Sequence, residues 1–219
     1  MAFPSLYNWA QLLEESEAFR PVLEQLAQQS RYQTGEFNDS LNDLLRVGVE
    51  LYQPDILPIQ HGWASSVTLL STRGQSLSRL EGVSAACLSL AGKFNSRRVS
   101  PGIFSQYWDV PTPVITHLEG QIPWMLDWHL NMPTVCSFQC SLLEPFLCED
   151  AMHLLIRANE VSLQYYFDGR VFEQGLFWCA CQSIVETLES QAQDQLKNQF
   201  LQALSTHPLE AISNIKLDI

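Results

Sequence analysis

The chain has 219 residues, of which 46% are hydrophobic, enough for one large core or for two units of about 100 residues each. Its 24 Asp and Glu residues outnumber its 12 Lys and Arg residues and give a net charge of -12. This acidic balance offers no broad basic surface to phosphates, so we expect no direct nucleic-acid binding.

Helical patterns dominate the first half of the chain, and strand signals are scarce. Amphipathic spacing predicts a helix from about Ser5 to Phe19 that stops near Pro21. Residues 40–52 predict a second helix with a leucine-rich face. Further helices are expected after Pro54 and Pro58 through Leu70, over residues 76–94, after Ser100-Pro101 and after Thr112-Pro113, where a capping residue precedes a helix-starting proline.

The second half repeats this organisation. Thr134 predicts the start of one helix, and others are expected near 149–166, 170–188, 193–204 and 208–217. A break near residues 131–133 predicts two domains, 1–131 and a shortened 132–219. Each contains a helix rich in small residues, GVSAACLSLAG in the first and GLFWCACQSIV in the second. Small side chains suit a central helix that its neighbours approach closely, so we predict two helical bundles of similar design.

The N-terminus and the cysteines predict a soluble, intracellular protein. The opening segment MAFPSLYNWAQLLEESE lacks the basic start and apolar core of a signal peptide, and no window reaches about 18 apolar residues. Five of the six cysteines lie in apolar helical patterns, and only Cys148 stands beside charges. We therefore expect reduced core thiols and no membrane partner.

Two stretches carry a resemblance to the cyclin family. LEGVSAACLSLAGKF, residues 80–94, resembles the family's central small-residue helix ending in Lys. LEGQIPWMLDWHLNMPTVCSF, residues 118–138, resembles its Glu-bearing fifth helix and the Pro-Thr-x-x-x-Phe start of the second fold. The short chain is also similar to virus-encoded cyclins. The resemblance implies an all-α protein with two tandem five-helix folds after an N-terminal helix.

The resemblance further implies a non-catalytic subunit, in nucleus and cytoplasm, that binds and activates a cyclin-dependent protein kinase. Lys93 and Glu119 match residues that hold backbone groups of the kinase's regulatory helix, and Trp128 and Leu130 match apolar positions that pack on it. The remaining candidates for the apolar contact are Leu6 and Trp9. Two alternatives remain open: a cyclin-fold transcription adaptor that does not activate the kinase, and a helical scaffold without a kinase partner.

Simpler explanations exist for the same residues. Lys93 also fits a lysine that complements the dipole at a helix C-terminus, and Glu119 fits a capping box with Thr116. Pro123 lies well inside the helix expected from Thr112 and removes a hydrogen bond to the Glu119 carbonyl. We expect a kink that changes the angle of Glu119, although a tolerated proline is the alternative.

The substrate-docking patch of cell-cycle cyclins looks degenerate in this chain, because the family's tryptophan is missing. That loss removes a large apolar anchor and predicts weak or no docking of Arg-x-Leu peptides. The corresponding positions are Leu41, Asn42, Leu44, Leu45, Gly48, Leu80 and Glu81.

The sequence contains no motif for catalysis or metal binding. Cys136-x-x-x-Cys140 and Cys179-x-Cys181 lack the usual zinc spacing, and there is no phosphate loop, nucleophile elbow or HExxH. We therefore expect no cofactor, no metal and no small-molecule substrate. RRVSP, residues 97–101, suits phosphorylation by a basic-directed or proline-directed kinase, but an N-cap role explains Ser100 as well.

Overall fold

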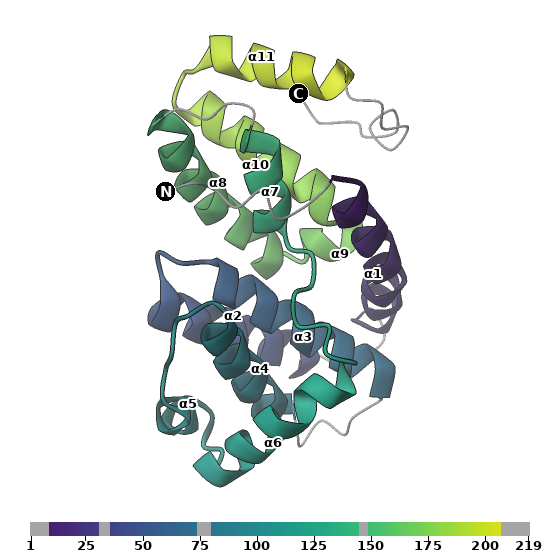
Figure 1. Cartoon of the computed structure of the whole chain (residues 1–219), viewed down its shortest axis with the longest axis vertical. Coiled ribbons are helices and arrows are strands. Elements are labelled where there is room, and N and C mark those ends of the chain that lie inside the picture. Colours follow the sequence, from purple (N-terminus) through teal and green to yellow (C-terminus); the bar gives the residue numbers. More distant parts are fainter. Residues whose placement is uncertain (1–8, 31–35, 74–79, 145–148, 207–219) are drawn as a thin grey trace.

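The computed structural model describes residues 9–30, 36–73, 80–144 and 149–206, and over these residues the chain is all-helical, without strands (Figure 1). The predicted all-α class is therefore confirmed for the described part. In chain order the helices are α1 (Trp9–Ser30), α2 (Glu36–Tyr52), α3 (Leu57–Arg73), α4 (Leu80–Phe94), α5 (Pro101–Trp108), α6 (Thr112–Met125), α7 (Val135–Leu143), α8 (Glu149–Phe167), α9 (Arg170–Gln174), α10 (Leu176–Ser190) and α11 (Asp194–Thr206).

The two helices rich in small residues are central, as their composition predicts. α4 packs against α2, α3, α5 and α6, and α10 packs against α7, α8, α9 and α11. Small residues are needed where helices touch: a Cβ on Gly62 of α3 would lie 3.0 Å from the Cα of Leu88 on α4. Figure 1 shows α2–α6 in one part of the molecule and α7–α11 in the other. The assignment of these parts to cyclin-like folds stays a prediction.

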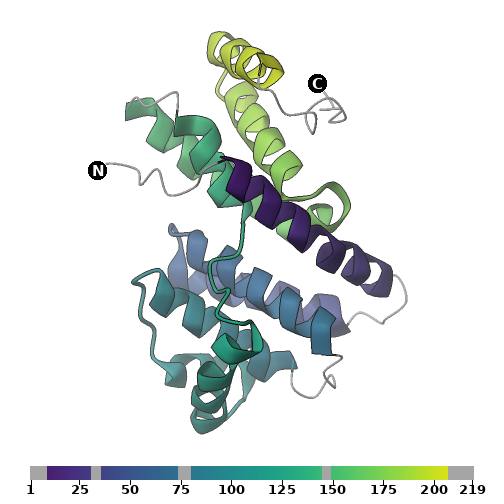
Figure 2. The ribbon, with the colours of Figure 1, turned by 45° about the vertical axis from the view of Figure 1, so that its right-hand side comes forward.

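α1 joins the two parts, because it packs against α3 in one and against α7 and α9 in the other. Figure 2 shows it crossing the molecule between them. The prediction that this helix stops near Pro21 is wrong, since α1 contains Pro21 and continues to Ser30. Pro21 is exposed, whereas Leu12, Phe19 and Leu23 are buried. Burial of this apolar face outweighs the roughly 3 kcal/mol that an interior proline costs.

α3 also connects the two parts through buried side chains. The ring of Trp63 meets that of Tyr166 edge-on, with 4.8 Å between centroids. Gln60 Oε1 accepts from the backbone N–H of Cys136 at 2.8 Å, and its Nε2 donates to Ser162 Oγ at 3.4 Å. These contacts join α3 to the first turn of α7 and to α8, so the two parts share one continuous core.

The second half follows the predicted helices with one interruption. The helix expected over 170–188 is divided into α9 and α10 at Gly175, whose φ of 85° lies in the left-handed region. Thr134 caps α7 as predicted, because its hydroxyl accepts from the N–H of Ser137 at 3.1 Å. The helix expected over 208–217 and the start of that expected over 76–94 lie outside the described residues.

Five cysteines in the described part of the chain are free, and four of them are buried. Among the described residues no helix is long and apolar enough to cross a membrane, and no cluster of potential metal ligands occurs. Cys148 lies outside the described residues. The cysteines confirmed as free are Cys87, Cys136, Cys140, Cys179 and Cys181.

Candidate functional site

The polar centre of the candidate site joins α4 to α6. Ser89 and Lys93 are one turn apart on α4 and face Glu119 on α6. The Lys93 ammonium donates to Glu119 Oε2 at 2.6 Å, and the Ser89 hydroxyl donates to Oε1. Glu119 is only 8% exposed, whereas 38% of the Lys93 side chain is exposed. Lys93 is therefore the accessible member of the pair.

The floor beneath this pair is tightly packed. The buried Tyr52 hydroxyl donates to the Leu88 carbonyl at 3.3 Å, and burial, followed by the charge of Glu119, raises the pKa of Tyr52 well above its ordinary value. Only glycine fits at position 92, because a Cβ on Gly92 would collide with the Tyr52 hydroxyl and lie 2.6 Å from the Arg97 carbonyl oxygen. The glycine before Lys93 is thus required by close packing.

The backbone fixes Lys93 in the last turn of α4. Ser96 adopts a left-handed conformation with φ 61°. Its N–H donates to the Lys93 carbonyl at 3.2 Å, and the Arg97 N–H donates to the Gly92 carbonyl at 2.7 Å. These two bonds form a Schellman motif, which satisfies the last carbonyls of the helix. The lysine is also well placed to complement the helix dipole, so that explanation and a role in binding are compatible.

α6 ends in the same way, shortly after its proline. Asp127 has φ 48°, its N–H donates to the Trp124 carbonyl at 3.3 Å, and the Trp128 N–H donates to the Pro123 carbonyl at 2.7 Å. Pro123 lies inside α6 as expected, but only two residues before the helix ends at Met125. The effect of the proline falls on the last turn, where the chain is already leaving the helix.

The capping-box explanation of Glu119 is wrong. Thr116 lies inside α6 rather than at its start, and its hydroxyl donates to the Thr112 carbonyl at 3.0 Å. The N-cap residue of α6 is Pro111. Glu119 instead binds across to α4, so its role is to join two helices.

Large apolar side chains stand exposed at the ends of the two helices that carry the polar pair. Phe94, the last residue of α4, is 51% exposed, and Trp124 and Trp128 are 69% and 58% exposed. The two tryptophan rings meet edge-on with 5.0 Å between centroids. Exposed aromatic pairs such as Trp124 and Trp128 are typical of protein-binding surfaces. We refer to Phe94, Trp124 and Trp128 as the aromatic surface.

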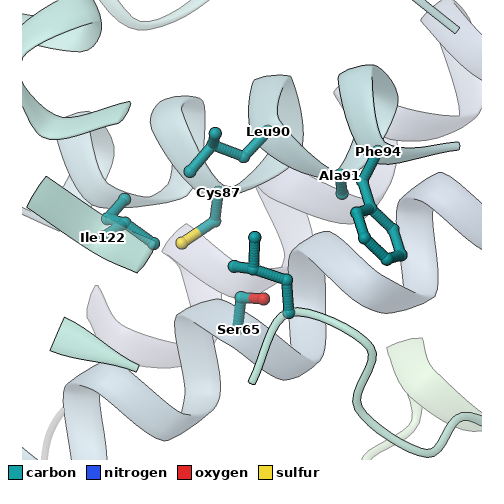
Figure 3. Close-up of a pocket in the computed structure, with 7 residues that line it drawn as sticks. Ser65, Cys87, Leu90, Ala91, Phe94 and Ile122 are labelled. Atoms are coloured by element: carbon teal, nitrogen blue, oxygen red, sulfur yellow. The ribbon is translucent and has the colours of Figure 1, made fainter. Parts of the chain in front are cut away.

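A small apolar pocket lies beside Phe94. Figure 3 shows Cys87 and Ser65 between Ile122 on one side and Phe94 on the other. The lining residues are Ser65, Cys87, Leu90, Ala91, Phe94, Ile122 and Leu130. The half-buried Leu130 lies two residues after Trp128 in the chain, and its N–H donates to the Trp128 carbonyl at 2.9 Å.

The titratable groups at this pocket are neutral near pH 7. Burial raises the pKa of the Cys87 thiol to about 12, so the thiol stays protonated and is a poor nucleophile. Burial lowers the pKa of His61 to about 4. Its ring meets Phe94 edge-on at 6.1 Å, and its Nδ1 lies 3.1 Å from Asn95 Nδ2. The pocket thus offers a mostly apolar lining, and Lys93, the residue before Phe94, adds a partly exposed side chain.

Of the residues that the sequence places at the site, the structure brings Lys93 and Glu119 into contact. Lys93 pairs with Glu119, and Trp128 and Leu130 lie at the aromatic surface and the pocket. Leu6 lies outside the described residues, as does the side chain of Trp9, the first residue of α1. Sequence reasoning missed Phe94 and Trp124, because an apolar residue in a helical pattern is normally assigned to the core.

The positions matched to the substrate-docking patch lie mostly in the interior. Gly48 of α2 packs so closely on α3 that a Cβ would lie 2.9 Å from an Ile59 side-chain atom. Asn42 is half-buried, and Glu81 is exposed. The fully buried members are Leu41, Leu44, Leu45, Gly48 and Leu80. These five residues are inaccessible to a docked peptide, while the binding of Arg-x-Leu peptides stays a prediction.

Comparisons with protein-family models, curated proteins and solved structures find no match to this chain.

Proposed function

We propose that this chain is a cyclin-like regulatory subunit that binds a cyclin-dependent protein kinase and activates it by docking on the kinase's regulatory helix. One observation carries the proposal: the accessible Lys93 ammonium is held by the buried Glu119 at the end of central helix α4, beside the exposed Phe94. This pair occupies the positions through which the resemblance implies kinase binding.

The chemistry of the pair suits a helix end on a partner. An ammonium has three N–H donors, and the bond to Glu119 uses one of them. The others are available to backbone carbonyls, which lack partners in the last turn of a helix and carry partial negative charge. Because Glu119 holds the ammonium in place, less side-chain freedom is lost on binding. Glu119 would thus position Lys93 rather than contact the kinase through its own engaged oxygens.

The apolar part of the surface supplies burial. Phe94, Trp124 and Trp128 are exposed in the free chain, and the pocket beside Phe94 offers an apolar floor for a side chain of the partner. Burying aromatic surface of this kind is the main source of affinity in most protein interfaces. The acidic net charge of -12 further suits a kinase that presents basic groups around the contact.

Activation would follow from population shift. An active protein kinase pairs a glutamate of its regulatory helix with the strand lysine that grips the ATP phosphates. A protein that binds this helix more tightly in the paired arrangement increases the population of the active state. The chain itself needs no catalytic group for this effect, and we propose that it acts in the nucleus and cytoplasm.

A capture experiment tests the proposal. Wild-type chain is immobilised and exposed to a panel of purified cyclin-dependent kinases, and each recovered complex is assayed on a peptide substrate. We expect at least one kinase to be captured and activated, and Lys93→Ala to weaken its binding by about tenfold or more. Lys197→Ala is the matched control, because Lys197 pairs with Glu189 at 3.0 Å between α11 and α10, away from the site.

Each outcome of this experiment has a distinct meaning. Capture without activation would support the alternative function of a cyclin-fold transcription adaptor. Failure to capture any kinase would support the remaining alternative, a helical scaffold without a kinase partner. Equal loss of binding in Lys93→Ala and Lys197→Ala would show that the proposed surface is not the contact.

A further inference from the structure

The segment between α4 and α5 carries a feature that the kinase-binding surface does not use. Arg97 and Arg98 precede Ser100 by three and two residues, and Pro101 follows it. Residues 97–100 are non-helical, and both arginines and the serine are exposed. A protein kinase can therefore reach this stretch without unfolding a helix on its N-terminal side.

The Ser100 hydroxyl is uncommitted. Ser100 is the N-cap residue of α5, with extended backbone angles of φ -65° and ψ 135°, but its side chain makes no cap hydrogen bond. Thr134, at the same position of α7, does make that bond to Ser137. The capping role that would explain Ser100 from sequence is thus absent, while its hydroxyl stays exposed to solvent.

The two arginines are available for recognition. Arg98 makes no ion pair with any residue in the described ranges, and Arg97 pairs with Asp55 at 3.1 Å through an exposed contact. Exposed ion pairs of this kind open at little cost. Pro101, by contrast, is half-buried and is the first residue of α5. A kinase that reads the arginines therefore meets accessible groups, whereas one that reads the proline must displace the start of a helix.

We propose that Ser100 is a phosphorylation site for an arginine-directed serine/threonine protein kinase. In the transfer, Ser100 Oγ attacks the γ-phosphorus of Mg-ATP, the bond from that phosphorus to the β,γ-bridging oxygen breaks, and ADP leaves. The hydroxyl proton passes to the catalytic base of the kinase. The inference does not depend on the function proposed above, since it concerns modification of this chain by a separate enzyme.

The phosphate would meet favourable partners where it forms. It would lie at the positive end of α5 and close in sequence to the Arg97 and Arg98 guanidinium groups, which bind phosphate oxygens well. Because α5 packs on α4 and α6, ordering its first turn would stabilise the helices that carry Lys93 and Glu119. We expect phosphorylation to raise the Tm by about 1 to 4 °C.

The test incubates the full chain with Mg-ATP and either a purified arginine-directed kinase or a purified proline-directed kinase, and maps phosphate by mass spectrometry. We expect near-complete phosphate on Ser100, about tenfold slower transfer to Arg98→Ala and Arg97→Ala, and an unchanged rate for Pro101→Ala. Ser105→Ala, a change at a half-buried serine inside α5, serves as the matched control and should leave transfer unchanged. The Tm of the phosphorylated chain is measured against that of the unmodified chain and of Ser100→Ala.

Three results would overturn the proposal: no phosphate on Ser100, a transfer rate that does not depend on the arginines, or transfer only by a proline-directed kinase with loss in Pro101→Ala. An unchanged Tm on phosphorylation would refute the expected contact of the phosphate with the first turn of α5.

Discussion

Lys93 and Glu119 form an asymmetric pair: the lysine side chain is more than one-third exposed, while the glutamate side chain, whose carboxylate lies 2.6 Å from the ammonium, is buried. The two residues come from different helices and also share Ser89, which donates to the second carboxylate oxygen. Removal of the lysine leaves a buried acceptor without its charged donor. Removal of the glutamate frees an accessible lysine and also leaves the buried Ser89 hydroxyl without its acceptor. Substitutions of Lys93 and of Glu119 can therefore test the interaction separately.

The first prediction concerns the stability of this pair. Lys93→Ala should lower the free energy of unfolding by about 1 to 3 kcal/mol, because the buried Glu119 loses its charged donor. In the background of Glu119→Gln the same change should cost much less, since the amide carries no charge. Urea unfolding of the four proteins in this double-mutant cycle measures the coupling energy, and strict additivity would contradict a direct interaction.

The second prediction concerns the glycine beneath the lysine. Gly92→Ala should destabilise the fold by about 1 to 3 kcal/mol, because its Cβ would collide with the Tyr52 hydroxyl. Gly120→Ala is the matched control, because a Cβ added to Gly120 on α6 would meet nothing within 4 Å. Alanine there should stabilise the helix by about 0.5 to 1 kcal/mol. Thermal unfolding separates the two, and equal effects would argue against the close packing at Gly92.

The third prediction concerns pH. His61 has a pKa near 6.5 when unfolded and about 4 in the buried site of the folded chain. Between these values the unfolded state binds the proton that folded His61 does not, so the unfolding free energy rises with pH from about 4 to 6.5 and then levels off. Lowering the pH from 7.5 to 5 should therefore remove about 2 kcal/mol through His61 alone.

The measurement for His61 is urea unfolding at both pH values, for wild type and for His61→Gln. Other groups titrate alike in the two proteins, so the difference between their pH effects isolates His61. If both proteins lose the same stability between pH 7.5 and 5, the histidine is not the group responsible.

The fourth prediction concerns the connection between the two parts. Gln60 satisfies the N–H of Cys136 in the first turn of α7 and donates to Ser162 on α8. Gln60→Leu should cost about 1 to 3 kcal/mol, because a buried N–H loses its acceptor. Gln121→Leu, at an exposed position of α6, should change stability by less than about 0.5 kcal/mol. A Gln60→Leu protein as stable as wild type would show that water replaces the lost bond.

Local chemistry explains what the sequence could predict. Thr134 starts α7 because its own hydroxyl binds an N–H three residues later, and such a bond is visible in the sequence as a capping residue. The small-residue helices α4 and α10 are central because their composition is the condition for close approach. Lys93 and Glu119 emerged from a residue pattern, and the structure places them in contact.

Tertiary contacts explain what the sequence could not predict. α1 continues through Pro21 because it is buried against both parts of the molecule, a contact that local propensity does not include. α6 ends soon after Pro123 because Asp127 takes a left-handed conformation that aspartate only occasionally adopts. The exposure of Phe94 depends on how other helices pack around the end of α4. The residue pattern within α4 does not predict that packing.

The most direct test of the central claim is the activity of the captured cyclin-dependent kinase as a function of added chain. Wild-type chain should raise activity on a peptide substrate to saturation. Phe94→Ala should shift the half-saturating concentration upward by about tenfold or more, because an exposed anchor is lost. Val114→Ala, at another exposed apolar position on α6, should match wild type. Saturation curves that coincide for Phe94→Ala and wild type, or activity that never rises with added chain, would contradict kinase activation through this surface.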